Sequence, residues 1–293
     1  MRFKNALTFA VVMVIAKSIF AAPYDQVLQK IEQLAQTYPK QAQIFTLGTN
    51  NQGQPIKGLK IGSGAVASLI VATHHGNEYG STATALGLAE ALVKNSIATQ
   101  TVYIIPVLNI AGYNRNDRYE PMSSGVVIDS NRDYPGPCMQ AKSFQLKSTE
   151  SLARFIDEKN IVISATLHTY WPAVLYPWGI SSTDLSTPYD DKYKELVHLA
   201  AAESHYQTGN NTEVLYPADG TFEDYAYWKH GIWSLLFELG FSHNPDPTAI
   251  KNMVDANVPG IRRFLESAPT ARASTHGFSG HCDSRKPMRL FLE

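Results

Sequence analysis

The chain has 293 residues and a formal net charge of −1, so bulk electrostatics give no reason to expect nucleic acid or an anionic membrane as a partner. Hydrophobic residues make up 44% of the chain, which is ample for a core, and charged residues make up 17%. The length permits one or two domains.

The first 22 residues have the composition of a secretory signal peptide. Arg2 and Lys4 precede an uncharged stretch, 6–16, that is too short to cross a bilayer as a helix. No later stretch is apolar enough to span a membrane. We therefore expect a secreted or periplasmic protein that has no membrane contact after cleavage. An uncleaved anchor or a buried first helix is the alternative.

The rest of the chain alternates between helix-like and strand-like segments. Apolar residues recur at helical spacing over 24–38, 81–94, 150–158, 190–204 and 248–266. Strand-like runs cover 43–47, 56–61, 67–73, 101–107, 161–166 and 232–237, and the first two flank a hairpin-type turn at 50–53. This alternation predicts an α/β class, a single-domain three-layer α/β/α sandwich around a mixed, mostly parallel twisted sheet. We expect one domain over 23–268 and a tail, 269–293, that either packs on it or trails.

The two cysteines, Cys138 and Cys282, allow one disulfide. In an exported protein such a bond is plausible, and it would join a loop to the C-terminal tail. The alternative is two separate thiols.

Two of the expected strands lead into candidate metal ligands. The run 67–72 is followed by Thr73-His74-His75-Gly76-Asn77-Glu78, and the run 161–166 leads to His168. Only His75, and not its neighbour His74, has a Glu three residues later. Two imidazoles and one carboxylate leave the fourth position of a zinc ion open, which is typical of a catalytic site. Ligands bind beyond the carboxyl ends of strands in open α/β sheets, so we expect these side chains to converge there on one zinc ion.

Five segments in order resemble motifs of the zinc carboxypeptidases related to carboxypeptidase A, in their compact bacterial-type branch. The segments are His75-Gly76-Asn77-Glu78, the stretch 106–113, Asp129-Ser130-Asn131-Arg132-Asp133-Tyr134, Leu167-His168-Thr169-Tyr170 with 175–179, and Phe237-Glu238-Leu239. Asn77 departs from the family, because carboxypeptidase A-like enzymes often carry Arg at this position.

The resemblance implies a role for each of these residues. It places zinc on His75, Glu78 and His168, the general base at Glu238 and oxyanion stabilisation at Arg118, with Arg115 as a helper. It implies that Asn131 and Arg132 hold the terminal carboxylate, that Asp129 accepts a hydrogen bond from a ligating His, and that Tyr216 folds over bound substrate. It also places Glu223 in the pocket for the terminal side chain, where a carboxylate would favour Lys, Arg or diaminopimelate.

These roles predict a secreted, monomeric zinc metallocarboxypeptidase that acts on peptides. The first alternative uses the same site on peptidoglycan stem peptides, as a carboxypeptidase or an amidase of γ-D-glutamyl-diaminopimelate bonds. An acylase of the related branch fits the motifs less well. An alternative of another class is a catalytically silent peptide-binding module, and the presence of Glu238 and all three ligands argues against it.

Overall fold

The computed structural model describes residues 23–138, 142–183 and 185–282. The expected signal peptide, 1–22, and the end of the expected tail, 283–293, lie outside the described residues. No helix in the described ranges is long and apolar enough to cross a membrane.

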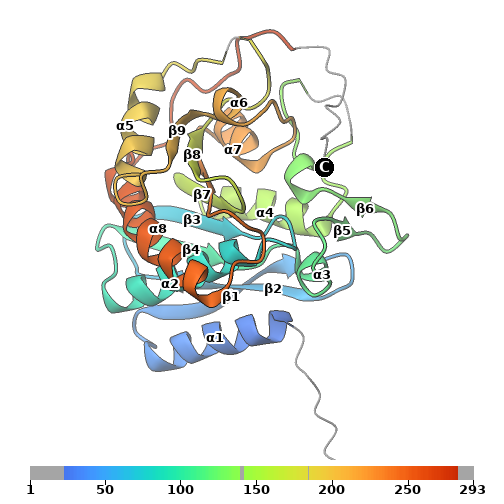
Figure 1. The fold of residues 1–293 in the computed structure, drawn as a ribbon, viewed down its shortest axis with the longest axis vertical. Helices are drawn as coiled ribbons and strands as arrows, with labels where there is room; N and C mark the ends of the chain where they lie inside the picture. The colour runs from blue at the N-terminus through green and yellow to red at the C-terminus, as the bar shows by residue number, and fades with distance from the viewer. Residues whose placement is uncertain (1–22, 139–141, 184, 283–293) are drawn as a thin grey trace, which may run out of the picture.

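An eight-stranded sheet with the order β1-β2-β4-β3-β7-β10-β8-β9 forms the centre of the molecule (Figure 1). Its strands are β1 (Ala42–Thr49), β2 (Pro55–Ile61), β3 (Val66–Ala72), β4 (Gln100–Ile105), β7 (Ile163–His168), β8 (Ala173–Tyr176), β9 (Gln207–Asn210) and β10 (Trp233–Glu238). The central pairs β4/β3, β3/β7 and β7/β10 are parallel, as is β8/β9, whereas β1/β2, β2/β4 and β10/β8 are antiparallel. The predicted mixed, mostly parallel α/β sheet is confirmed.

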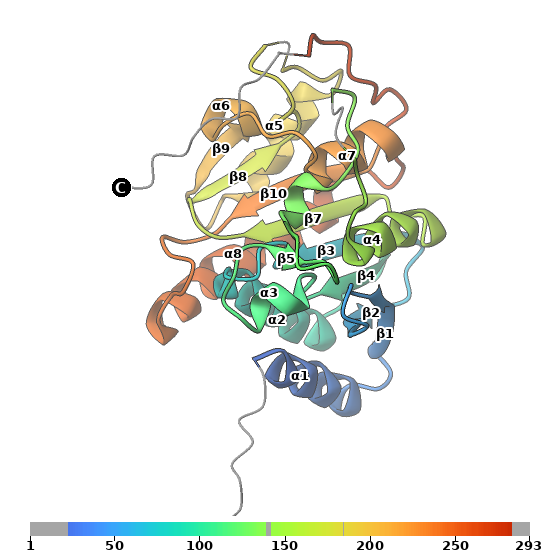
Figure 2. The ribbon, with the colours of Figure 1, turned by 90° about the vertical axis from the view of Figure 1, so that its right-hand side faces the viewer.

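Helices cover both faces of this sheet (Figures 1 and 2). One apolar cluster joins α2 (Tyr79–Lys94), α5 (Asp190–Ala200) and α8 (Pro247–Ser267) to one face, and a second joins α4 (Lys147–Glu158) and α7 (Phe222–His230) to the other. The remaining elements are α1 (Pro23–Thr37), α3 (Ile110–Tyr113), β5 (Glu120–Pro121), β6 (Val127–Ile128), a 3-10 turn (Ser130–Arg132) and α6 (Asn211–Val214). The predicted helices and strands are all present, with ends shifted by a few residues.

Alternation along the central strands decides which side chains reach the site. In β7, Ile163, Ala165 and Leu167 belong to the cluster on the α2 face. Side chains of successive strand residues point to opposite faces, so His168 leaves β7 on the other face, with Thr166. The same alternation applies to β10, where Leu235 and Phe237 face α2 and Glu238 faces the α7 side.

Strand β8 and helix α7 are among the elements that were not predicted from the sequence. Strand β8 is fully buried but has only four residues, between Pro172 and Pro177, so it carries no alternating pattern. Helix α7 buries residues around most of its circumference, so it lacks the polar face that marks an amphipathic helix. The expected helix over 190–204 ends at Ala200, and the backbone N–H of His205 closes the following turn on the carbonyl of Ala201.

The C-terminal segment, 268–282, packs back on the domain without forming a strand. The indole of Trp233 donates to the carbonyl of Ala271, and the backbone N–H of Ala273 donates to the carbonyl of Gly231. Cys138 and Cys282 form a disulfide, so the predicted bond between a loop and the tail is confirmed.

Candidate metal centre and active site

The turn after β3 delivers His75 and Glu78 to the end of the sheet. Thr73 adopts a left-handed backbone conformation (φ 62°), unusual for a β-branched residue, and its buried hydroxyl bonds to Ser81 and Thr82. At Gly76, a Cβ would lie 2.1 Å from the carbonyl carbon of Gly112, so only glycine fits there. The turn is therefore fixed by its packing before any ligand binds.

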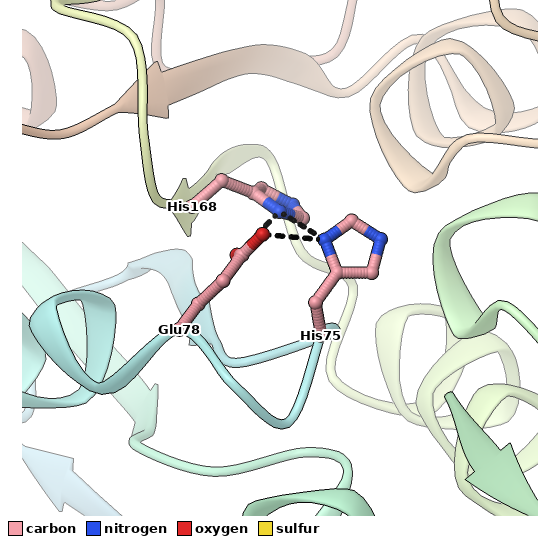
Figure 3. Close-up of side chains that lie close together, drawn as sticks. All are labelled: His75, Glu78 and His168. Atoms are coloured by element: carbon pink, nitrogen blue, oxygen red, sulfur yellow. Dashed lines mark hydrogen bonds and ion pairs between the residues drawn. The ribbon is translucent and has the colours of Figure 1, made fainter. Parts of the chain in front are cut away.

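His75, Glu78 and His168 converge at this end of the sheet (Figure 3). Nδ1 of His75 lies 2.7 Å from Oε1 of Glu78, Nδ1 of His168 lies 3.0 Å from Oε2 of Glu78, and the two Nδ1 atoms are 3.2 Å apart. All three residues are buried, and their candidate ligand atoms lie within 4.8 Å of one another. The predicted set of zinc ligands is brought together.

The hydrogen bonds around His75 suit a cation at this point. Its Nε2 lies 3.0 Å from Oδ1 of Asp129, and a carboxylate can only accept, so Nε2 carries the proton. The other ring nitrogen, Nδ1, faces a carboxylate oxygen of Glu78. Two acceptors at 2.7 Å need a shared proton or a cation between them, so this donor set fits a metal ion.

The charges of the metal-free centre are strongly coupled. Burial would raise the pKa of Glu78, but the neighbouring imidazoles outweigh it and lower that pKa far below its usual range. Burial would lower the pKa of His168, but the charge of Glu78 and its hydrogen bond raise that pKa to about 9. A proton therefore occupies the centre at neutral pH when no metal is present.

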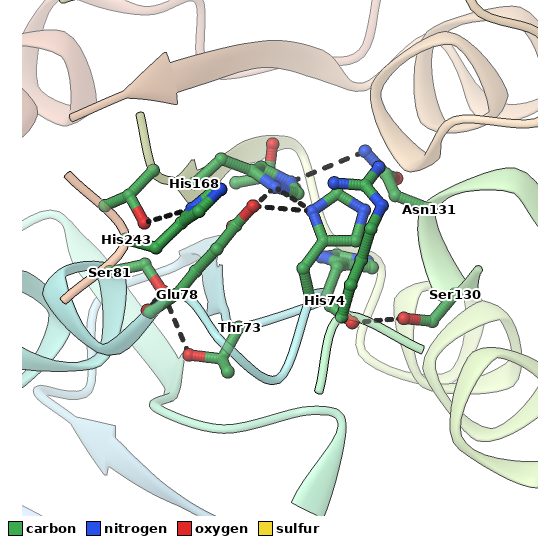
Figure 4. A network of polar contacts seen from close by, with 12 residues as sticks. Thr73, His74, Glu78, Ser81, Ser130, Asn131, His168 and His243 are labelled. Carbon is green, nitrogen blue, oxygen red and sulfur yellow. Dashed lines mark hydrogen bonds and ion pairs between the residues drawn. The ribbon is translucent and has the colours of Figure 1, made fainter. Parts of the chain in front are cut away.

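His74 points away from this centre. Its Nε2 lies 3.0 Å from the hydroxyl of Tyr134, and its ring stacks on that of His168 with centroids 5.5 Å apart. Its backbone carbonyl accepts a hydrogen bond from the hydroxyl of Ser130 (Figure 4). Burial, and then the two neighbouring histidines, lower its pKa well below the usual value. The competition between His74 and His75 is thus settled by direction, since only His75 faces Glu78.

Asp129 connects the metal centre to Arg118. Its Oδ1 accepts from His75, as predicted, and its Oδ2 accepts from Nε and Nη2 of Arg118 at 3.0 and 2.8 Å. Burial would raise the pKa of Asp129, but His75 and the two arginines Arg118 and Arg132 lower it well below its usual value. Arg115 is half exposed and pairs with Asp117 at 3.9 Å, away from these contacts.

Glu238 lies beside His168 at the end of the adjacent parallel strand. The two residues are register partners in the β10/β7 pair. Burial raises the pKa of Glu238 to about 8, against the attraction of His168. Its Oε2 is buried and has no hydrogen-bond partner among the described residues. A buried carboxylate with a free oxygen beside a metal centre is suited to exchange protons.

A cavity opens beside the metal centre. Its lining includes the metal ligands His75 and His168 with Glu238, the predicted substrate residues Asn131, Arg132 and Tyr216, and the unpredicted residues Asn211, Leu215, Ala218, Thr221 and Leu236. Asn131 is fixed in this wall, because its Oδ1 accepts from the backbone N–H of Phe222 and its Nδ2 lies 3.4 Å from Nε2 of His168. Thr221 caps the start of α7, because its hydroxyl oxygen accepts from the backbone N–H of Asp224. The spacing Thr-x-x-Asp is a sequence signal for a helix start and could have located α7.

Glu223 is buried next to His168, which lines this cavity, but Glu223 itself is not among the lining residues. Its Oε1 accepts from the hydroxyl of Thr166 and lies 4.0 Å from Nε2 of His168, and its Oε2 has no hydrogen-bond partner among the described residues. The alternative that this side chain points to solvent is therefore wrong.

The chain is similar in sequence and in fold to known proteins. A family model described as zinc carboxypeptidase matches residues 27–260. Carboxypeptidase B of Astacus astacus is 24% identical over 251 residues, which are 71% of this chain and 82% of that protein. Bovine thrombin-activatable fibrinolysis inhibitor has a similar fold, with a TM-score of 0.76, 20% identity and coverage of 83% of this chain and 95% of that one. Murein-tripeptide amidase of Escherichia coli O157 is more distant, with a TM-score of 0.53, 17% identity and coverage of 77% and 92%.

Proposed function

This chain belongs to the zinc carboxypeptidase family and is a zinc-dependent peptide hydrolase, and from that premise we propose that it is exported and releases one residue at a time from the carboxyl end of peptides. The convergence of His75, Glu78 and His168 beside Glu238 carries this proposal. We assign one zinc ion to these three ligands. Bound there, zinc would lower the pKa of a water toward about 7 and polarise the scissile carbonyl.

Glu238 acts as the general base in this proposal. Its raised pKa and its free Oε2 support proton transfer near neutral pH. The carboxylate accepts a proton from the attacking water and then gives it to the amine of the leaving residue as the C–N bond breaks. Its place beside His168 puts that carboxylate next to the ligand cluster.

Arg118 stabilises the negative charge that develops on the scissile oxygen. Its bond to Asp129 fixes the guanidinium near the metal centre, because Asp129 also holds His75. A fixed positive charge of this kind stabilises the transition state more than the ground state. Arg115 has no comparable anchor, so we give it a minor role at most.

Asn131 and Arg132 bind the terminal carboxylate of the substrate. Both line the cavity beside the metal centre, and Arg presents a planar fork that matches a carboxylate. Tyr216 lines the same cavity from the loop between α6 and α7, from which it would cover a bound terminal residue. A free terminal carboxylate is therefore a requirement of this site.

Glu223 sets the preference for the terminal side chain. Its buried Oε2 has no hydrogen-bond partner among the described residues, and such a buried acceptor is costly. The amine of Lys or diaminopimelate, or the guanidinium of Arg, would supply a donor from a substrate bound in the cavity that His168 lines. We therefore propose basic or diaminopimelate-like terminal residues.

We propose a periplasmic or secreted location and a monomer, with one catalytic domain over 23–268. The disulfide between Cys138 and Cys282 supports an oxidising compartment, and the N-terminal composition supports a signal peptide over 1–22.

A peptidoglycan stem peptide is the second candidate substrate. The Glu223 pocket suits the amine of diaminopimelate, and the fold is shared with a murein-tripeptide amidase. The remaining alternative, a catalytically silent peptide-binding module, would bind peptides without hydrolysing them.

Hydrolysis of a matched panel by the zinc-loaded protein tests these proposals. The panel holds acyl-dipeptides that end in Lys, Arg, Phe or Leu and a stem peptide with diaminopimelate. Release of Lys or Arg that is lost in Glu223→Gln, while release of Phe persists, supports the preference for basic terminal residues. Release of Phe or Leu alone contradicts the pocket and keeps the peptidase. Cleavage of only the stem peptide selects the second candidate, and peptide binding without any turnover selects the binding module.

A further inference from the structure

The hairpin of β5 and β6 carries a buried carboxylate that the mechanism above does not use. Glu120 is the register partner of Ile128 in this hairpin, and its side chain is 0% exposed. The hydroxyl of Ser148, in α4, donates to Oε2 of Glu120 at 2.6 Å. Its Oε1 is buried and has no hydrogen-bond partner among the described residues. Glu120 therefore fastens the hairpin to α4 through one oxygen and leaves the other unpaired.

The first turn of α4 holds a second carboxylate from the same segment of chain. Thr149, next to Ser148, donates its hydroxyl to Oδ2 of Asp133 at 2.6 Å. Two backbone N–H groups just before the helix also donate to this carboxylate, at 2.9 and 3.0 Å. The segment 120–133 is thus tied to α4 at both ends, by Glu120 at its start and by Asp133 at its end. Figure 2 shows β5 and α4 side by side.

This segment and the residues just before it carry groups that the proposed mechanism needs. Arg118 lies two residues before Glu120, and its guanidinium donates to Asp129, which directly follows β6. Asn131 and Arg132, the proposed carboxylate clamp, lie between Asp129 and the second tie to α4. A loosened anchor at Glu120 would therefore disturb the charge at the oxyanion and the carboxylate clamp together.

The surroundings of Glu120 favour its neutral form. A buried oxygen without a partner costs more free energy on an ionised carboxylate than on a neutral carboxyl group. Burial, and then the nearby charge of Asp133, raise the pKa of Glu120 to about 7, although the hydrogen bond from Ser148 opposes them. No cation among the described residues offsets the charge of Glu120. Its ionised form is therefore the strained one.

The other titratable groups around this anchor come from three elements. Burial raises the pKa of Asp133, but its three hydrogen bonds stabilise the charged form. Burial holds the pKa of the Tyr134 phenol well above its usual value, so this group stays neutral. Lys147 and Glu150, on the first turn of α4, are exposed to solvent. Glu120 is thus the group of this cluster that changes its charge near neutral pH.

We propose that Glu120 is a positioning residue whose neutral form fastens the segment 118–133 to α4, and that loss of its proton loosens this segment and lowers catalysis above neutral pH. The new charge lies buried beside the carboxylate of Asp133, and the two like charges repel each other. This inference rests on the proposed function and adds a pH dependence to the same site.

A pH series of kcat/KM, with an acyl-dipeptide that ends in Lys, tests this role. The zinc-loaded wild type and Glu120→Gln, which cannot ionise at this position, are compared at each pH, so that titrations shared by both proteins cancel. We expect the ratio of variant to wild type to rise at least about fivefold between pH 6 and pH 8.5, because a group with a pKa of about 7 is then almost fully ionised in the wild type.

Two further variants separate this role from a merely structural one. Ser148→Ala removes a hydrogen bond that favours the charged form, so the pH at which half of the activity is lost should move upward. Alanine is a good helix former, so this variant should fold. Glu158→Gln is the matched control, because Glu158 is an exposed glutamate at the other end of α4, and its ratio to the wild type should not change with pH.

A ratio for Glu120→Gln that stays constant from pH 6 to pH 8.5 overturns the proposal. If that variant does not fold, an unmoved pH profile in Ser148→Ala overturns it, and an upward shift supports it.

Failure of the proposed function would appear differently, as no hydrolysis by any of these proteins at any pH. Hydrogen–deuterium exchange of the segment 118–133, compared between the wild type and Glu120→Gln at the same pH, then decides the role of Glu120. Faster exchange in the wild type at pH 8.5, with equal exchange at pH 6, supports the pH-sensitive anchor. Equal exchange at both pH values overturns it.

Discussion

Glu238 and His168 are register partners in the parallel pair of β10 and β7, so the proposed base and the third metal ligand leave the sheet side by side. Side chains at paired positions of adjacent strands point to the same face. The distance between the two groups is therefore set by the spacing of strands within the sheet and not by a loop. The proposed base and the metal ligand thereby stand on two interior strands of the sheet.

The variant Glu238→Gln should lose hydrolysis and keep its zinc. A glutamine has the same shape but cannot accept the proton of water, so we expect kcat to fall by about 10²–10⁴-fold. Zinc content by atomic emission and far-UV circular dichroism should match the wild type. A variant that retains more than a tenth of the activity would contradict the role of general base.

Removal of Arg118 and of Arg115 should have unequal effects on catalysis. Arg118→Met should lower kcat by about 10²-fold or more, because it removes the charge that faces the developing oxyanion. Arg115→Met is the matched control and should stay within about threefold of the wild type, since its partner is the surface residue Asp117. Equal losses from steady-state kinetics of the two variants would remove Arg118 from the oxyanion site.

Loss of the Asp129 carboxylate should weaken zinc binding. Asp129 accepts from Nε2 of His75 and so fixes the nitrogen that faces Glu78. We expect Asp129→Asn to raise the zinc Kd by about 10–100-fold, the usual cost of losing a partner behind a ligating imidazole. Competition with a chelator of known affinity measures this change. An unchanged Kd would show that His75 is held by its packing alone.

Zinc binding should release protons at neutral pH. In the metal-free protein the pKa of His168 is raised from 6.5 to about 9, so this imidazole is protonated at pH 7. Its protonation adds to the free energy of unfolding, fully below pH 6.5, and this stabilisation is lost as the pH rises through 9. Zinc must displace that proton, and its charge also lowers the raised pKa of Glu238. Calorimetry of zinc binding at pH 7, in buffers of different ionisation enthalpy, measures the protons released per zinc ion. We expect more than about one for the wild type and about one for Glu238→Gln. Zinc binding without proton release would contradict this assignment of charges.

Reduction of the disulfide should destabilise the fold. The bond joins Cys138 to Cys282 across 144 residues, and removing a native disulfide from a small domain costs about 2–5 kcal/mol. Urea unfolding of the double variant Cys138→Ser and Cys282→Ser, compared with the wild type, measures this loss. If the urea midpoint and the slope of the unfolding transition are the same for both proteins, the hydrogen bonds of segment 268–282 hold that segment in place without the disulfide.

The metal centre was predictable because each ligand follows an apolar strand, and apolar strands are visible in one sequence. His75 and His168 follow the runs that became β3 and β7, so their meeting at one end of the sheet followed from the α/β class. The residues that line the cavity were harder to predict from the sequence. Asn211 and Thr221 start the short α6 and the nearly all-buried α7, and neither helix has an amphipathic pattern.

The direction of a side chain was the other feature that the sequence left open. Glu223 could face solvent or the core from the same position, and only the packing of α7 against Thr166 decides that it is buried. The sequence separated His75 from His74 only by the Glu three residues after His75, and the structure adds the direction of each ring. The bond of His74 to Tyr134 turns it away from the centre, and that contact spans 60 residues of sequence.

Cleavage of one peptide in two forms tests the central claim most directly. A decapeptide ending in Lys is prepared with a free terminal carboxylate and with a terminal amide, and each is incubated with the zinc-loaded wild type and with Glu238→Gln. We predict that mass spectrometry will show release of the terminal Lys from the free acid by the wild type alone. Equal cleavage of the amide, or cuts within the chain, would contradict a carboxypeptidase that holds the terminal carboxylate at Asn131 and Arg132.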